Sequence, residues 1–245
     1  MSVVAGTELL APDAWLARTL GRPAFGLRVP LPPAPQLAAA LARLPGDVFC
    51  FAKVPESDGA SSATLEGCGF RQVDTQVTLE RAAHPAPAAP RVEVRRAEPR
   101  DRDAVLDIAG SCFHYSRFHQ DARIGLQAAH AVKRAWAANC LDGKRGEEVL
   151  VALDEGRPAG FLAVLLAPDA AVIDLIGVAT GSQRRGIGGA LVDAFVARWR
   201  GRASRLRVGT QAVNAPSIAL YERCGFRRVG ATRVLHAHLR DGRPA

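Results

Sequence analysis

The stretch that decides the fold is Val178-Ala179-Thr180-Gly181-Ser182-Gln183-Arg184-Arg185-Gly186-Ile187-Gly188-Gly189-Ala190-Leu191. An apolar strand ends at Val178, a glycine-rich loop follows, and a helix begins near Gly189. Backbone N–H groups in such a loop, together with the N-terminus of the helix, suit a pyrophosphate. Glycine has no Cβ, so a phosphate can approach the backbone closely, and Arg184 and Arg185 add positive charge. The pattern predicts a nucleotide-binding loop.

Two familiar phosphate-binding motifs do not fit this loop. A Walker loop requires a Lys-Ser or Lys-Thr pair after the second glycine, and the sequence has neither. A dinucleotide-binding fingerprint requires a βαβ repeat and an acidic residue about 20 positions further on, and these are also missing.

The segments around the loop alternate between strands and helices. Apolar patterns and turn residues predict strands over 92–96, 148–153, 159–166, 172–178, 206–211 and 229–239, and helices over 101–112, 128–141, 189–199 and 216–224. The turn at 156–158 joins two of the strands into a hairpin. Together these elements predict an α+β fold with a mixed, largely antiparallel sheet.

A break in composition divides the chain. Residues 82–91 contain three prolines among small residues, which predicts an Ala/Pro linker between an N-terminal domain, 1–81, and a C-terminal domain, 92–245. The segment 65–73 echoes 221–229, since both hold Cys-Gly-Phe-Arg before a strand. We interpret the N-terminal domain as a truncated relative of the C-terminal one, although two unrelated helix-to-strand turns would give the same echo.

The overall composition is that of a globular protein with a basic surface. The formal charge is +8 and the sequence pI is about 9.9, but the arginine pairs lack the interleaved aromatic residues of a nucleic-acid platform. We therefore expect no nucleic-acid partner and keep DNA binding as a distant alternative. Five scattered cysteines predict reduced thiols and a cytoplasmic location. No apolar run or signal-peptide pattern predicts membrane insertion or export.

Three motifs together resemble the GNAT superfamily of N-acetyltransferases. They are Gln183-x-x-Gly186-x-Gly188, Asn214, and Tyr221-x-x-Cys224-Gly225-Phe226, and the resemblance covers about residues 92–240. It implies the GNAT acyl-CoA N-acyltransferase fold, preceded here by a smaller truncated GNAT-like domain. It also implies acetyl-CoA as co-substrate and no metal.

The resemblance to GNAT enzymes also implies the cofactor site. The residues expected to bind the cofactor are Ile176, Gly177, Val178, Gln183, Arg184, Arg185, Gly186, Ile187, Gly188, Gly189, Ala190, Asn214 and Tyr221. The Val178 N–H is the implied donor to the thioester oxygen, and Tyr221 is the implied general acid that protonates the leaving thiolate. Thr180 and Arg184 depart from the family pattern, where proline and glycine are common.

A narrower resemblance points to dTDP-fucosamine acetyltransferases of bacterial surface-polysaccharide synthesis. It rests on Ser116-Arg117-Phe118, Trp136-x-x-Asn139 and Leu206-Arg207-Val208-x-Thr210-Gln211. It implies acetyl transfer to the 4-amine of a dTDP-linked amino-dideoxy sugar, by direct attack in a ternary complex, with Asp74 as the base. We expect Arg117, Phe118 and His119 to bind the acceptor, because arginine suits a diphosphate and an aromatic ring suits thymine. Relatives often pair, so a homodimer is a further expectation.

Several alternatives stay open at this point. Asp174 interrupts an apolar strand and is a competing base, since an unpaired buried carboxyl has a raised pKa. Water is a third candidate. The acceptor could be another small amine or a peptide amine, and a module that binds CoA without turnover is an alternative of another class. Trp136 and Asn139 fit packing and helix-ending roles, and we interpret His236 and His238 as part of a half-exposed strand face.

Overall fold

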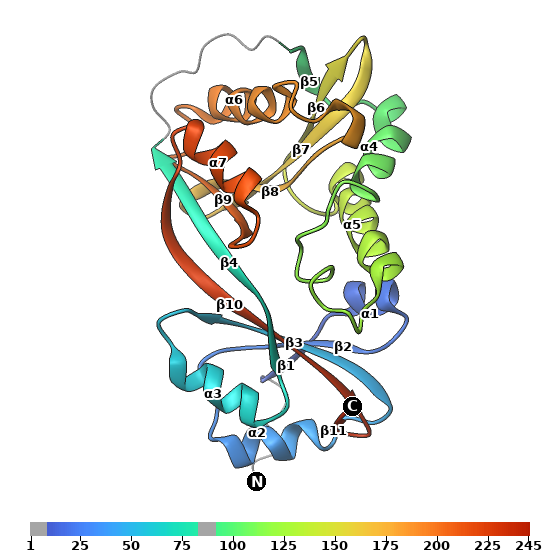
Figure 1. Cartoon of the computed structure of the whole chain (residues 1–245), viewed down its shortest axis with the longest axis vertical. Coiled ribbons are helices and arrows are strands. Elements are labelled where there is room, and N and C mark those ends of the chain that lie inside the picture. The colour runs from blue at the N-terminus through green and yellow to red at the C-terminus, as the bar shows by residue number, and fades with distance from the viewer. Residues whose placement is uncertain (1–8, 83–91) are drawn as a thin grey trace.

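The structure, a computed structural model, describes residues 9–82 and 92–245, so all of the predicted linker except Ala82 lies outside the described residues. A single mixed sheet runs through both halves of the molecule (Figure 1). Its strands, in spatial order, are β1 (Leu10–Pro12), β2 (Ala24–Leu27), β3 (Asp47–Pro55), β10 (Arg227–Arg240), β4 (Arg71–Ala82), β9 (Arg205–Gln211), β8 (Ala170–Val178), β7 (Arg157–Ala167), β6 (Glu148–Asp154) and β5 (Val94–Arg96), and β11 (Arg243–Pro244) pairs with β10. Only β2 with β3 and β8 with β9 are parallel among these strands, which confirms the predicted α+β class with a mixed sheet.

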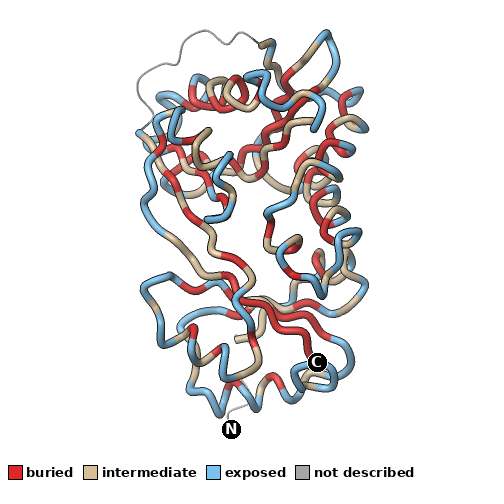
Figure 2. Tube along the Cα trace, viewed as in Figure 1, coloured by how far each residue is buried: buried red, intermediate tan, exposed pale blue. Residues whose placement is uncertain are grey.

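Helices cover both faces of the sheet. They are α1 (Ala14–Leu20), α2 (Ala34–Leu41), α3 (Gly59–Gly67), α4 (Arg102–Ala109), α5 (Leu126–Leu141), α6 (Ile187–Trp199) and α7 (Ala215–Arg223). In the C-terminal half, α6 and α7 pack on one face and α4 and α5 on the other. Figure 2 shows the buried residues concentrated along the strands and on the helix sides that face them.

Most predicted elements of the C-terminal half are confirmed, with shifted ends. The helix predicted over 101–112 ends at Ala109, because the chain turns at Gly110 and runs as a loop to Gly125. The helix predicted from 128 begins at Leu126, and the one predicted from 189 begins at Ile187 after the left-handed residue Gly186. The hairpin turn consists of residues 155 and 156, both with positive φ, as a type I′ turn requires.

The two halves exchange strands at the centre of the sheet. β10 follows α7 in the C-terminal half, yet it lies between β3 and β4 of the N-terminal half. β4 follows α3 and lies between β10 and β9. The long ribbons of β4 and β10 therefore run side by side through the middle of the molecule (Figure 1).

The echo noticed in the sequence has the same local structure in both halves. Phe70 N–H donates to Leu65 O and Phe226 N–H donates to Tyr221 O, both at 3.0 Å. The glycine before each phenylalanine has positive φ, so each helix ends in a Schellman-type cap. A common origin of the two halves stays a prediction.

Candidate functional site

The parallel strands β8 and β9 separate at the centre of the sheet. They pair only over residues 170–173 and 205–208, although β8 continues to Val178 and β9 to Gln211. Ala179 N–H donates to Ala159 O beside β7 (2.8 Å). Because successive N–H groups of a strand point to opposite sides, the Ile176 and Val178 N–H groups point toward β9, where the ladder has already ended.

A β-bulge explains why β8 leaves its neighbour. The register with β7 shifts between Ala163 and Val164, which leaves Asp174 without a residue opposite it. A bulge bends the strand that carries it and increases its twist. The bend comes immediately after the last pair with β9, so it turns the end of β8 away from that strand.

The predicted nucleotide loop joins the end of β8 to α6. Arg184 and Gly186 have φ of 62° and 83°, and Ala190 N–H makes the first helical bond, to Gly186 O (3.0 Å). The N–H groups of residues 187–189 precede that bond, and a helix N-terminus carries positive partial charge. Arg185 forms an ion pair with Asp154. The loop thus presents backbone donors and exposed arginines.

The start of α6 lies beside the end of β8 and beside α7. A Cβ on Gly188 would be 3.2 Å from Leu220 Cδ2 and 3.8 Å from Val178 Cγ2. Asn214 is the N-cap of α7, where its Oδ1 accepts from the Ser217 N–H (3.3 Å). The structure therefore brings together the loop, the strand end and the helix that carries Tyr221.

Tyr221 is 2% exposed and packs in the core beneath α6. Its hydroxyl forms no hydrogen bond with a described residue. Among those residues, the only side-chain nitrogen or oxygen that is both sealed from solvent and unpaired is Trp199 Nε1. The Tyr221 hydroxyl must therefore reach solvent. Burial, followed by the nearby Cys224, raises its pKa above the ordinary value, so the phenol stays protonated and can donate.

Asp74 lies on the opposite face of the sheet from Tyr221. Lys53, Val234 and Asp74 are directly opposite one another on β3, β10 and β4, so they share one face. Val77 packs against α6, and the alternation along β4 therefore places Asp74 on the α4 and α5 side. Asp74 is 7% exposed, and burial raises its pKa to about 6, although hydrogen bonds from Thr75 N–H and the Gln211 side chain oppose this shift.

The three predicted acceptor residues lie on the same side of the sheet as Asp74. The Arg117 guanidinium lies 4.3 Å from the ring centroids of Phe51 and Phe118, and Phe118 is itself fully buried. His119 is half-buried and hydrogen-bonds to Ser116 Oγ (2.6 Å). The structure gives all three residues partners within the protein, and contact with an acceptor stays a prediction.

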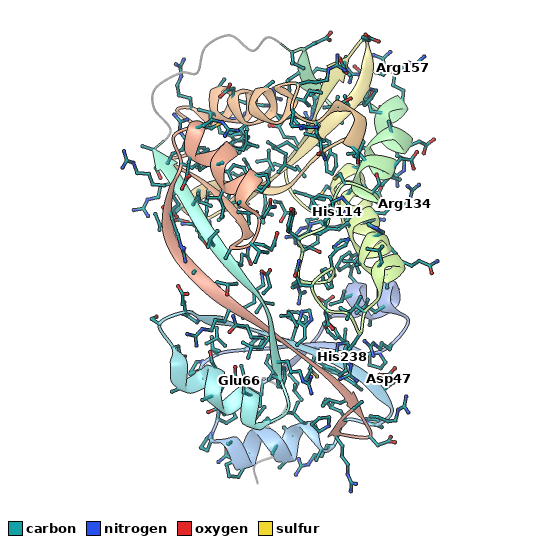
Figure 3. All side chains as sticks on the ribbon, viewed as in Figure 1. Asp47, Glu66, His114, Arg134, Arg157 and His238 are labelled. Carbon is teal, nitrogen blue, oxygen red and sulfur yellow. The ribbon has the colours of Figure 1, made fainter. Side chains whose placement is uncertain are left out.

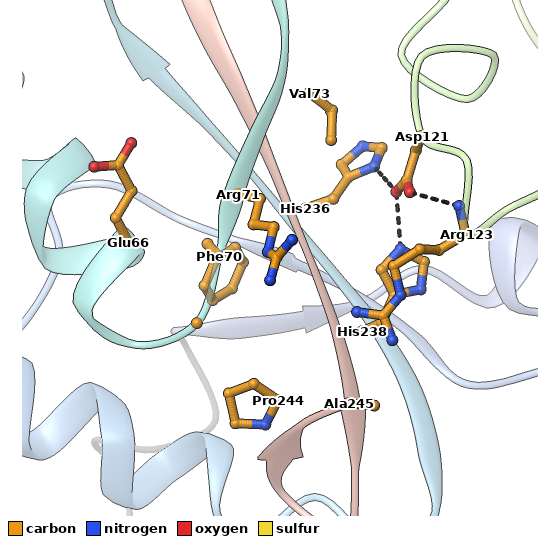
Figure 4. Close-up of a pocket in the computed structure, with 11 residues that line it drawn as sticks. Glu66, Phe70, Arg71, Val73, Asp121, Arg123, His236, His238, Pro244 and Ala245 are labelled. Carbon is orange, nitrogen blue, oxygen red and sulfur yellow. Dashed lines mark hydrogen bonds and ion pairs between the residues drawn. The ribbon is translucent and has the colours of Figure 1, made fainter.

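The interpretation of His236 and His238 as a half-exposed strand face is wrong. Both are buried, because Arg117, Phe118 and Asp121 of the segment 111–125 contact one or both rings. Figure 3 labels His114 of this segment in the upper half of the molecule and His238 of β10 in the lower half. Both rings contact one oxygen of Asp121, at 2.7 and 2.8 Å (Figure 4). Arg117 donates to His236 Nε2 and Arg22 to His238 Nδ1, so each histidine carries its proton on the nitrogen that faces Asp121.

This network anchors the segment that carries Arg117. Burial tends to raise the pKa of Asp121, but the two histidine donors outweigh it and hold that pKa below its usual range. A cavity of about 260 Å³ adjoins the network, lined also by Arg71 and Arg123 (Figure 4). Asp121 itself is fully paired, because its other oxygen accepts from the Arg123 N–H. In the described part of the chain, no group of three or more His, Cys, Asp or Glu residues could hold a metal ion.

Asp174 is not the unpaired carboxyl that the sequence suggested. Arg145 donates to both of its oxygens at 2.6 Å, and Trp136 Nε1 donates at 2.8 Å. These donors occupy both oxygens of Asp174, so the carboxylate is engaged within the protein. The Asn139 backbone oxygen accepts from the Lys144 and Arg145 N–H groups beyond the end of α5, and the Trp136 indole donates to Asp174, so both residues have internal roles, as predicted.

Comparisons with known proteins identify the family. Residues 103–226, just over half of the chain, match the Acetyltransferase (GNAT) family, and the chain belongs to this family. One relative is the spore coat polysaccharide biosynthesis protein SpsD of Bacillus subtilis (strain 168), which is 31% identical over 183 residues. That match covers 73% of this chain but only 62% of SpsD.

Solved structures share the fold. A conserved protein of unknown function from Staphylococcus epidermidis superposes with a TM-score of 0.61 at 14% identity, over 95% of this chain and 92% of that one. A GCN5-related N-acetyltransferase from Sphaerobacter thermophilus gives 0.57 at 18% identity, over 82% and 62%. None of the helices in the described part of the chain is long and apolar enough to cross a membrane.

Proposed function

We propose that this chain is an N-acetyltransferase that transfers the acetyl group of acetyl-CoA to the 4-amine of a dTDP-linked amino-dideoxy sugar. The observation that carries the proposal is the separation of β8 from β9 beside the N-terminus of α6 and the Tyr221 hydroxyl. Membership in the GNAT family supports the reaction. The name of the SpsD relative and the resemblance to dTDP-fucosamine acetyltransferases support the acceptor.

In this proposal, acetyl-CoA approaches from the α6 and α7 side and supplies an activated acetyl thioester. The N–H groups of residues 184–189 hold its diphosphate, with Arg184 and Arg185 nearby and Asn214 at the start of α7. The Val178 N–H donates to the thioester oxygen, where negative charge develops during attack. The Tyr221 hydroxyl protonates the departing thiolate.

The amine approaches from the α4 and α5 side. Asp74 takes a proton from it, directly or through a water molecule, so that the free amine attacks in a ternary complex. An acyl-enzyme on Cys112 is disfavoured, because burial raises the pKa of this thiol to about 11 and keeps it protonated. A cytoplasmic location and a homodimer belong to the same proposal.

The role of Tyr221 can be tested by removing one oxygen atom. Tyr221→Phe should lower kcat about 100-fold, since a general acid contributes roughly that much or more. It should change the acetyl-CoA Kd less than about twofold, because the phenol acts on the sulfur only during the reaction. Tyr115, the only other tyrosine, is exposed, and Tyr115→Phe is the matched control. An equal loss of kcat in both variants, or an unchanged kcat in Tyr221→Phe, would contradict the assignment of Tyr221 as the general acid.

A panel of amines assayed by release of free thiol tests the acceptor. The proposal predicts the highest kcat/KM for a dTDP-4-amino-4,6-dideoxyhexose among sugars, polyamines and peptides. Turnover confined to another amine would leave the reaction in place and overturn this acceptor. Acetyl-CoA binding without turnover of any amine would favour a CoA-binding module.

A further inference from the structure

Lys133 is a buried cation without a partner. It lies on α5 and is only 8% exposed, and its ammonium forms no ion pair or hydrogen bond with any residue that the structure describes. Its neighbours are the rings of Phe113 and Trp136, whose centroids are 4.7 and 4.9 Å from Nζ. Burying an unpaired charge is costly, and the two aromatic rings compensate only in part. We therefore expect a bound ligand to supply the negative charge that pairs with Lys133.

The ammonium of Lys133 is open to such a ligand. The one unpaired side-chain nitrogen or oxygen that is sealed from solvent, among the described residues, is Trp199 Nε1. Lys133 Nζ is unpaired too, so it must remain accessible even though the rest of the side chain is covered.

Lys133 also lies close to the end of β8. Its charge acts on Cys112, which lies in the segment 111–125 directly after α4. A Cβ built on Gly177 would be 2.7 Å from Cys112 Sγ. Lys133 thus lies on the α4 and α5 side of the sheet, in the region where Cys112 packs against β8.

Two more cations reach the same region from other elements. Lys53 on β3 and Arg117 in the segment 111–125 both act electrostatically on Lys133. Burial, and then Arg117, lowers the pKa of Lys133 to about 8. Lys53 is exposed and donates to Gln76 Oε1 (3.1 Å). The chain has only three lysines, so two of the three lie here.

The carboxyl groups nearby do not balance this charge. Asp174 is held by Arg145, and Asp74 has a raised pKa and forms no ion pair with a described residue. Asp13 and Asp121 act on Arg117, but Asp121 is already held by His236, His238 and the Arg123 N–H. Lys133 itself forms no ion pair with a carboxylate of the described residues. Such an arrangement attracts an anion.

We propose that Lys133, assisted by Arg117 and Lys53, binds a negatively charged phosphoryl or carboxylate group that the acceptor carries near its amine. This inference rests on the proposed function, because it places the acceptor on the α4 and α5 side. In a nucleotide-linked amino sugar the anion is the diphosphate, and in an amino acid it is the carboxylate.

Calorimetric titration of the full chain tests the anion site. The protein is first saturated with CoA, which blocks the loop before α6, and is then titrated with pyrophosphate or with malonate. We expect one anion to bind. Lys133→Met should weaken that binding about tenfold or more, as expected for a lost charged contact, and Lys133→Arg should retain most of it. Lys144 is exposed and paired with Asp142, so Lys144→Met is the matched control and should change nothing.

The outcomes separate the two proposals. Tighter binding of pyrophosphate than of malonate would identify a phosphoryl group as the anion of the acceptor. Tighter binding of malonate would identify a carboxylate. If CoA binds but neither anion does, or if Lys133→Met binds the anion as well as Lys144→Met, the anion site is wrong while the acetyltransferase proposal stands. If CoA fails to bind, the acetyltransferase proposal itself fails. If Lys133→Met misfolds and loses CoA affinity, Lys53→Met replaces it in the test. Lys53→Met should weaken binding of the anion about fivefold.

Discussion

Asp74 is a buried carboxyl group on the α4 and α5 side of the sheet, and no arginine, lysine or histidine forms an ion pair with it in the described structure. Its pKa of about 6 leaves it deprotonated at neutral pH, yet basic enough to accept a proton from an ammonium group in the course of attack. Asp174, in contrast, is held by Arg145. This difference in partners is the reason that the proposed mechanism uses Asp74 and not Asp174 as the base.

Replacing Asp74 should affect activity and stability in opposite directions. Asp74→Asn should lower kcat/KM about 100-fold and abolish the decline of wild-type kcat/KM below about pH 6. The folded-state pKa lies above the ordinary value of 3.8, so the native state binds this proton more tightly than the unfolded chain. The contribution of Asp74 to the free energy of unfolding of the wild type is therefore present below about pH 4 and is lost as the pH rises to about 6.

It follows that Asp74→Asn should raise the free energy of unfolding at pH 7.5, by on the order of 1 kcal/mol. Urea unfolding at pH 4 and 7.5 measures the difference, and Asp103→Asn on the exposed side of α4 is a suitable control. A variant with unchanged activity and the wild-type pH profile would remove Asp74 from the mechanism.

The local structure predicted from the sequence was correct where the neighbours are close in the chain. The glycine and phenylalanine after the helix that carries Tyr221 predicted the end of that helix, and Gly225 has the expected positive φ. The predictions failed where the partner is distant in sequence. Nothing near His236 indicates Asp121, which lies 115 residues away, and nothing near Asp174 indicates Arg145.

At the scale of the elements, α4 and the loop that follows it pack closely against the end of β8. A Cβ on Gly177 would lie 2.7 Å from Cys112 Sγ and 2.8 Å from Phe161 Cε1, closer than such atoms approach. Only glycine at this position lets the loop that follows α4 lie directly against β8.

Gly177→Ala should therefore push this loop away from β8. We expect a loss of about 1–3 kcal/mol in the free energy of unfolding, as is usual for overpacking, together with a higher KM for the amine. Gly181→Ala is the control, because a Cβ there meets nothing within 4 Å. The midpoint of urea unfolding at constant m-value gives the comparison. Equal midpoints for the two variants would show that the loop does not depend on this contact.

At the scale of the whole molecule, strands from both predicted domains pair in a single sheet. β4 pairs with β9 from Gln76 to Ala82 and with β10 along most of its length, so an N-terminal strand completes the C-terminal sheet. The order of local elements followed from periodicity, whereas this exchange could not be predicted, because periodicity does not specify which strands pair. The predicted division into domains 1–81 and 92–245 stays a prediction.

Strand exchange gives that prediction a sharp test. A fragment of residues 92–245 would leave the inner edges of β9 and β10 without β4, and we expect it to show no cooperative thermal unfolding. Addition of a fragment of residues 1–82 should restore the transition. Circular dichroism during heating measures both. A cooperative transition in 92–245 alone would mean that the C-terminal half needs no strand from the other half.

The most direct test is a crystal structure of the protein with CoA. The account predicts the diphosphate against the N–H groups of residues 184–189, the pantetheine arm between β8 and β9, and the sulfur within about 3.5 Å of the Tyr221 hydroxyl. CoA bound elsewhere, or a Tyr221 hydroxyl directed away from the sulfur, would contradict it.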